Sequence, residues 1–210
     1  MSRHAILFVM LLVNSLSMCA SADSATEACL KGKSCLEKGD LISAITAFTE
    51  AIKEDHKSSD AYYYRALALR KNGELDKAIA DYTEAIQIDP KLPEAYNNRG
   101  IAYTDNSEYD KAITDCTEAI RLNPKYAEAY YDRGRAYSQK ENLVKAIDDC
   151  TVAIRLKPNF AAAYSLRGWA YEKKGEKVKA IVDFARAKKL EYPLDGRESP
   201  TSPVPGDGKK

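Results

Sequence analysis

The residues best suited to covalent chemistry in this sequence are cysteines and histidines, and both are few. Beyond residue 22 the chain has four cysteines and a single histidine, His56. Cys29 and His56 fall near the same end of one predicted helix pair, where a nucleophile and its base are conceivable. No third orienting group and no oxyanion donor accompanies them, so the sequence favours a surface role for His56 and no catalysis. It also lacks the ligand spacing of a metal site and a glycine-rich phosphate loop, so no cofactor is expected.

The four cysteines form two sets by position. Cys29 and Cys35 lie on one predicted helix, where their Cα atoms would be roughly 10 Å apart, beyond the reach of a disulfide. A bond between them would require the start of this helix to fray, and that alternative stays open. Cys116 and Cys150 share one apolar position of the repeat described below, which predicts buried and unreactive thiols.

A second set of residues recurs in a way that indicates ion pairs. The arginines are Arg65, Arg99, Arg133 and Arg167, and the aspartates are Asp81, Asp115, Asp149 and Asp183. Within each set, successive residues are 34 apart, which is the period of the repeat described below. The first repeat, 25–58, has neither type and carries Lys31 and Ala47 at the two positions. Because the two types appear and vanish together, we predict a ladder of Arg–Asp pairs that ties helices to one another. A basic stripe for an anionic ligand is the alternative.

The composition excludes several classes of protein. Of the 210 residues, 45% are hydrophobic and 30% are charged, which is too apolar for a wholly disordered chain. Basic and acidic residues number 32 and 31, a net charge of +1, whereas a general nucleic-acid binder needs a basic surplus. The 14 tyrosines against 4 phenylalanines are an unusual excess that a repeat explains.

The beginning of the sequence predicts export. Arg3, an apolar run over 5–13 and the stretch Ala20-Ser21-Ala22 predict a signal peptide that is cleaved after Ala22, giving a periplasmic or extracellular protein. The apolar run is too short to cross a bilayer. A lipoprotein box ending at Cys19 is the alternative, which would anchor the protein in the envelope, although Met18 departs from the pattern of such boxes.

A period of 34 residues organises most of the chain. Alanine recurs at this spacing in two positions, beginning with Ala44 and Ala51, and isoleucine recurs in a third, beginning with Ile45. The predicted segments are 1–22 (signal peptide), 25–58, 59–92, 93–126, 127–160 and 161–194 (repeats), and 195–210 (a disordered tail, rich in proline and glycine).

Each repeat predicts two helices. In the third repeat, Pro93 opens the first helix, and the second runs from about residue 109 to 122 with an apolar stripe at helical spacing. Small residues such as Gly100 and Ala112 let the two helices approach closely. Tyrosines such as Tyr96 fill the space beside them, which accounts for much of the tyrosine excess.

This pattern resembles the tetratricopeptide repeat family, whose units carry W-x₂-L-G-x₂-Y, A-x₃-F, A and P at a period of 34 residues. The matching residues of the third unit are Tyr96, Arg99, Gly100, Tyr103, Ala112, Cys116, Ala119 and Pro124. Tyrosine stands where the family has tryptophan, and arginine where it has leucine. The resemblance covers 25–194 and implies an all-α fold, a right-handed α-solenoid of five tandem helix-turn-helix repeats with a concave groove.

In this family, particular positions of each first helix line the groove, and most of them here are not dictated by the repeat. The predicted partner-binding groove consists of Tyr63, Leu67, Arg70, Asn97, Ile101, Tyr131, Arg135, Ser165 and Trp169. Trp169 is the only tryptophan and lies outside the packing positions, which is typical of a binding anchor. The alternative is that Trp169 packs under the tail or the last helix. The lysine, asparagine and arginine set of the chaperone-binding carboxylate clamp occurs in no three consecutive units, so that partner is not expected.

Together these features predict an exported, non-enzymatic scaffold that binds a peptide or protein segment in its groove. A self-associating structural or assembly module of the cell envelope is the alternative, because the last repeat lacks a further helix to cover it. No nucleic-acid partner is expected, and membrane attachment is expected only if Cys19 is lipidated.

Overall fold

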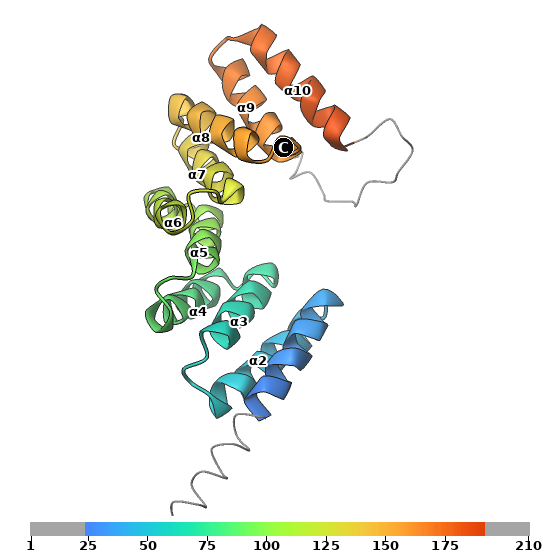
Figure 1. Ribbon diagram of the computed structural model, residues 1–210, viewed down its shortest axis with the longest axis vertical. Helices are drawn as coiled ribbons and strands as arrows, with labels where there is room; N and C mark the ends of the chain where they lie inside the picture. Colours follow the sequence, from blue (N-terminus) through green and yellow to red (C-terminus); the bar gives the residue numbers. More distant parts are fainter. Residues whose placement is uncertain (1–23, 192–210) are drawn as a thin grey trace, which may run out of the picture. The chain divides into compact units, whose positions relative to one another are not determined.

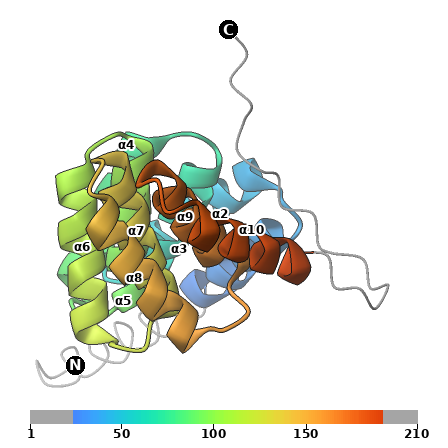
Figure 2. The same cartoon turned by 90° about the horizontal axis from the view of Figure 1, so that it is seen from above.

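The computed structural model describes residues 24–191, which divide into two compact units, one ending at Pro124 and one beginning at Lys125 (Figures 1 and 2). Every regular element between residues 24 and 191 is a helix, which confirms the predicted all-α class. None of these helices is long and apolar enough to span a membrane. The predicted signal peptide over 1–22 and the predicted tail over 195–210 lie outside the described residues.

The first unit is a series of helices joined by short turns (Figure 1). In chain order they are a helix over 24–37, α2 (Leu41–Glu54), α3 (Ser59–Lys71), α4 (Leu75–Ile88), α5 (Pro93–Asp105) and α6 (Tyr109–Leu122). Within a repeat, α3 packs against α4 and α5 against α6. Between repeats, α2 packs against α3 and α4 against α5. The bounds of α5 and α6 confirm the two helices predicted for the third repeat.

The second unit repeats this arrangement with two helix pairs. They are α7 (Ala127–Gln139), α8 (Leu143–Leu156), α9 (Ala161–Lys173) and α10 (Lys177–Glu191). Each helix packs against the next, and α9 and α10 lie side by side in Figure 2.

Small residues set the distance between the two helices of a pair. A Cβ added to Gly100 would lie 2.8 Å from Sγ of Cys116 and 3.2 Å from the backbone oxygen of Ala112. A Cβ on Gly134 would lie 3.3 Å from the backbone oxygen of Ala146. The close approach predicted from these small residues is confirmed, since no larger side chain fits there without a shift.

The turn inside each helix pair needs one residue with left-handed backbone. Gly39, Gly73 and Gly175 adopt φ values of 76°, 85° and 79° at this position, and Ser107 and Glu141 adopt 62° and 58°. Glycine takes this conformation readily, whereas a residue with a Cβ loses roughly 1–2 kcal/mol. The turns of the third and fourth repeats are therefore strained relative to the others.

Candidate functional site

Four Arg–Asp pairs join a first helix to the second helix of the same repeat. On α5, Nε of Arg99 donates to Oδ2 of Asp115 at 2.7 Å, and Nη2 donates to Oδ1 at 2.8 Å. The same two-bond geometry, at 2.6–2.8 Å, is found in the pairs Arg65–Asp81, Arg133–Asp149 and Arg167–Asp183. The Arg99 and Asp115 side chains are only 15% and 8% exposed. A paired, largely buried ion of this kind holds two helices in one relative position.

A threonine from the preceding repeat extends the pairs into a ladder. Nη1 of Arg65 donates to Oγ1 of Thr49 on α2 at 3.1 Å, and Nη1 of Arg99 donates to Thr83 on α4 at 3.0 Å. In the second unit, Arg167 donates to Thr151 at 3.1 Å. Each of these arginines thus links three helices. This geometry favours the structural role over the basic stripe, because the guanidinium donors already have protein acceptors.

Aromatic rings complete the surroundings of the ladder arginines. The rings of Tyr62, Tyr96, Tyr130 and Tyr164 lie 5.6–5.8 Å from the guanidinium carbon of the arginine three residues later. At this distance the ring face attracts the cation. The hydrogen bonds to Asp81 raise the pKa of Arg65 above its ordinary value, so the arginine stays charged at any physiological pH.

The groove positions of the first unit lie on α3 and α5. The Tyr63 hydroxyl accepts a hydrogen bond from Nδ2 of Asn98 at 3.1 Å, which joins the two helices. Burial raises the pKa of Tyr63 to about 12, so it remains a neutral phenol. Asn97 is only 2% exposed, so the structure places it beneath this surface.

The remaining groove positions of the first unit combine an ion pair with aliphatic side chains. Nη1 of Arg70 lies 3.6 Å from Oδ2 of Asp105 on α5. Leu67 and Ile101 are half-buried on α3 and α5. The first unit therefore presents two half-buried aliphatic side chains and a long ion pair at these positions.

The groove positions of the second unit are more aromatic. The Tyr131 ring lies 5.0 Å from the ring of Phe160, and burial raises the pKa of Tyr131. Trp169 on α9 keeps 36% of its surface exposed, with Nζ of Lys173 5.8 Å from its ring. Arg135 and Ser165 are half-buried.

Between residues 24 and 191, the cysteines show no sign of an activated nucleophile. Cys116 and Cys150 are fully buried, as predicted, and burial raises the pKa of Cys150 to about 12. Cys29 and Cys35 are free thiols on the helix over 24–37. Burial raises the pKa of Cys29, whereas a nucleophilic thiol needs a lowered one. His56 is exposed in the turn after α2. Among residues 24–191, no cluster of three or more metal-binding side chains occurs.

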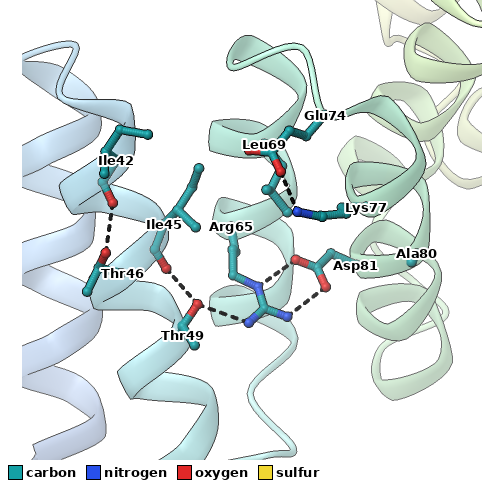
Figure 3. A pocket seen from close by; sticks show the side chains of 10 residues that line it. All are labelled: Ile42, Ile45, Thr46, Thr49, Arg65, Leu69, Glu74, Lys77, Ala80 and Asp81. Carbon is teal, nitrogen blue, oxygen red and sulfur yellow. Dashed lines mark hydrogen bonds and ion pairs between the residues drawn. The ribbon is translucent and has the colours of Figure 1, made fainter.

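The first unit also contains a hollow that is not among the features predicted from the sequence. A cavity of about 520 Å³, here called the α2–α4 cavity, lies between α2 and α4, and residues of α3 form part of its wall (Figure 3). Its walls include Ile42, Ile45, Arg65, Leu69, Glu74 and Lys77. The signal that could have revealed it is Leu69, which stands where the next three repeats have tyrosine.

Comparisons with known proteins agree with this architecture. Models of the TPR repeat match residues 67–107, and models of the tetratricopeptide repeat match 93–126, 47–80 and 116–148. A crystal structure of MamA is 32% identical over 76% of this chain and 94% of that chain, with a TM-score of 0.69. The chain belongs to the tetratricopeptide repeat family. The predicted family and the predicted α-solenoid class are thereby confirmed.

Two further structures share the tetratricopeptide repeat fold at lower identity. MamA from Desulfovibrio magneticus RS-1 is 22% identical, over 83% of this chain and 98% of that chain, with a TM-score of 0.74. PilF from Pseudomonas aeruginosa is 20% identical, over 81% of this chain and 78% of that chain, with a TM-score of 0.74. No curated protein matches the sequence significantly. In general terms, a tetratricopeptide repeat protein of this kind is a scaffold for protein–protein interactions.

Proposed function

We propose that this tetratricopeptide repeat protein is a non-enzymatic scaffold whose groove positions bind a peptide or protein segment. The observation that carries the proposal is the contrast between residues that recur and residues that do not. The ladder arginine is the same in four repeats, whereas the groove position that is Leu67 in the second repeat is Ile101, Arg135 and Trp169 in the next three. Packing therefore leaves this position free to specify a ligand.

The chemistry of these positions indicates the kind of segment that would bind. Trp169 and Tyr131 supply the large amphipathic surfaces that commonly act as binding anchors. Leu67 and Ile101 supply apolar contact in the first unit. We therefore expect a ligand with apolar anchor residues rather than a purely ionic one.

Fluorescence of Trp169 tests the proposal directly. A partner is captured by cross-linking to the mature protein in its own envelope fraction and is then titrated in pure form. Binding should change the Trp169 emission, and Tyr131→Ala should weaken binding about tenfold or more. Val144→Ala on α8, which is exposed and outside the groove positions, is the matched control. No change in emission together with an unaltered affinity of Tyr131→Ala would contradict groove binding.

The absence of catalysis is the second part of the proposal. The raised pKa of Cys29 supports it, because the thiol is largely protonated at neutral pH. Alkylation of the folded protein by iodoacetamide at pH 7 should be no faster than that of free cysteine. A much faster reaction at Cys29 would contradict this part of the proposal and support a nucleophilic Cys29 with His56 as its base.

Self-association through the last helix is a second candidate function. On α10, Ile181 and Phe184 are 67% and 37% exposed, whereas Phe48, at the position of Phe184 in the first repeat, is fully buried. Ala185 and Lys188 replace the threonine and isoleucine that recur at these positions in the earlier repeats. A second copy would therefore not pack on α10 in the way that one repeat packs on the next. A protein that sediments as a monomer at high concentration would exclude this candidate.

We further propose that the protein is exported through residues 1–22. The mature N-terminus decides between the two routes. A mass that begins at Asp23 supports cleavage by signal peptidase, an acylated Cys19 supports lipid anchoring, and an unprocessed chain contradicts both.

A further inference from the structure

One position of the first helices is aromatic in three repeats and aliphatic in the second. It is occupied by Tyr103, Tyr137 and Tyr171, and by Leu69 in the second repeat. Each tyrosine ring has a lysine of the following helix beside it. The distances from Nζ to the ring centroid are 5.2 Å for Lys111–Tyr103, 5.1 Å for Lys145–Tyr137 and 5.1 Å for Lys179–Tyr171.

The ladder arginine lies close to the same ring. The guanidinium carbon is 5.9 Å from the ring centroid in the pair Arg99–Tyr103 and 6.0 Å in the pair Arg167–Tyr171. The repeat thus brings a ring near two cations, an arrangement that attracts the electron-rich face of the ring.

In the second repeat the two cations remain and the ring is missing. Arg65, Leu69 and Lys77 stand at the three corresponding positions, and all three line the α2–α4 cavity. In Figure 3, Ile45 on α2 and Lys77 on α4 lie on opposite sides of the cavity, and the Arg65 guanidinium lies between Thr49 and Asp81. The aliphatic Leu69 is 5% exposed and has no ring to fill this space.

We propose that the α2–α4 cavity binds an aromatic side chain of a partner protein, which takes the place that the tyrosine ring has in the next three repeats. This surface is distinct from the groove of the proposed function. Because successive residues of a helix turn by about 100°, Leu69 lies about 200° around α3 from the groove residue Leu67. Occupation of one surface therefore does not block the other.

The charges of the cavity favour a neutral ring over an anion. Arg65 already donates to both carboxylate oxygens of Asp81, and Nζ of Lys77 lies 2.6 Å from Oε2 of Glu74. An anion would compete with these carboxylates for the two cations. An aromatic ring would not, because it only has to turn its face toward a cation that stays paired. The third repeat provides the precedent, since Lys111 pairs with Glu108 and still lies beside the Tyr103 ring.

The rim of the cavity favours a ring carried by a protein. Ile42 lines the cavity and is 65% exposed. The residue one repeat later, which has the same place relative to the Tyr103 ring, is the charged Asp76. The apolar surface thus continues outside the cavity, where a single small aromatic molecule would leave it in water. A protein segment that inserts a ring would also cover Ile42.

Titration with p-cresol, the tyrosine side chain as a free molecule, tests the chemistry. Methyl NMR signals of Ile42, Ile45 and Leu69 should shift in a saturable way. The non-aromatic control 4-methylcyclohexanol should bind about two- to fivefold more weakly, because it lacks the ring face. Equal affinity of the two compounds, or shifts that do not saturate, would overturn the proposal.

Three variants locate the site. Leu69→Tyr fills the cavity with the ring of the other repeats and should abolish p-cresol binding, while the matched change Tyr103→Leu should create a second binding site beside Ile79. Lys77→Met keeps the stem of an exposed side chain and removes one of the two positive charges, so it should reduce the preference for p-cresol without repacking. Unchanged binding in Leu69→Tyr, or an unchanged preference in Lys77→Met, would count against the site.

Cross-linking identifies the source of the ring. A diazirine amino acid of leucine size replaces Ile42 in the full chain, within the cells that produce it, and cross-linked peptides are sequenced by mass spectrometry. The expected product joins position 42 to a segment of another protein that contains an aromatic residue, and Leu69→Tyr abolishes it. Cross-links only to this chain itself, cross-links that persist in Leu69→Tyr, or no cross-link at all would overturn the protein-partner assignment.

Discussion

The two faces of each first helix follow different rules. On α5, the face that carries Arg99 and Gly100 packs against α6, and an arginine stands at the first of these positions in four of the five repeats. On the other face, the residue type at the position of Ile101 differs in every repeat, and it is Arg135 and Trp169 in the last two. The difference teaches that helix packing dictates one face, and that the other is available for recognition.

The largest expected effect comes from breaking the packed face. Asp115→Ala leaves the Arg99 guanidinium largely buried without its carboxylate partner, and we expect a loss of about 3 kcal/mol in the free energy of unfolding. Urea denaturation followed by circular dichroism measures it. Glu128→Ala, which breaks the more exposed pair with Lys157, is the control and should cost about 0–1 kcal/mol. Similar losses in the two variants would contradict the structural role of the ladder.

A smaller loss is expected from crowding the same face. The Cβ introduced by Gly100→Ala would lie 2.8 Å from Sγ of Cys116, which forces a shift that costs roughly 1–3 kcal/mol. Gly134→Ala should cost less, because its nearest contacts are 3.3 Å away. Thermal unfolding of both variants checks this order, and the reverse order would show that the helix spacing is set elsewhere.

A gain in stability is expected at a strained turn between the helices. Glu141 has a φ of 58°, so Glu141→Gly should stabilise the fourth repeat by about 1 kcal/mol. Gly73→Ala makes the opposite change in the second repeat and should destabilise it by a similar amount. Chemical denaturation would refute this explanation if Glu141→Gly proved less stable than the original protein.

The variable face should respond least in stability. Trp169→Ala removes a side chain that is 36% exposed, so the unfolding midpoint should fall by less than in any variant of the ladder. A loss as large as that of Asp115→Ala would indicate that Trp169 packs under the last helix at the end of the second unit.

The sequence alone predicts the packed face well and the rest less completely. The pairing of Arg65 with Asp81 follows from their joint recurrence, and the burial of Cys116 follows from its apolar position. The part played by Thr49 does not follow, because a recurring threonine also suits an exposed helix surface. The burial of Asn97 is equally hidden, since its helical position places it among the groove residues.

The α2–α4 cavity shows why a hollow is harder to predict than a contact. Leu69 is apolar and buried, as its helical position requires, and nothing in its own residue type reports a missing ring. The tyrosine at the same position of the next repeat, together with the distances of Lys111 and Arg99 to the Tyr103 ring, shows what occupies this space there. The missing ring is therefore recognised only when the second repeat is compared with the repeats that follow it.

The central claim is that the variable face binds and the packed face only supports it. The most direct test is isothermal titration of the captured partner into the original protein and into Trp169→Ala, with the unfolding midpoint of each measured in parallel. We predict that affinity falls about tenfold or more in Trp169→Ala, which corresponds to about 1.4 kcal/mol or more, while the midpoint changes little. An affinity within twofold of the original in a folded Trp169→Ala would contradict the claim.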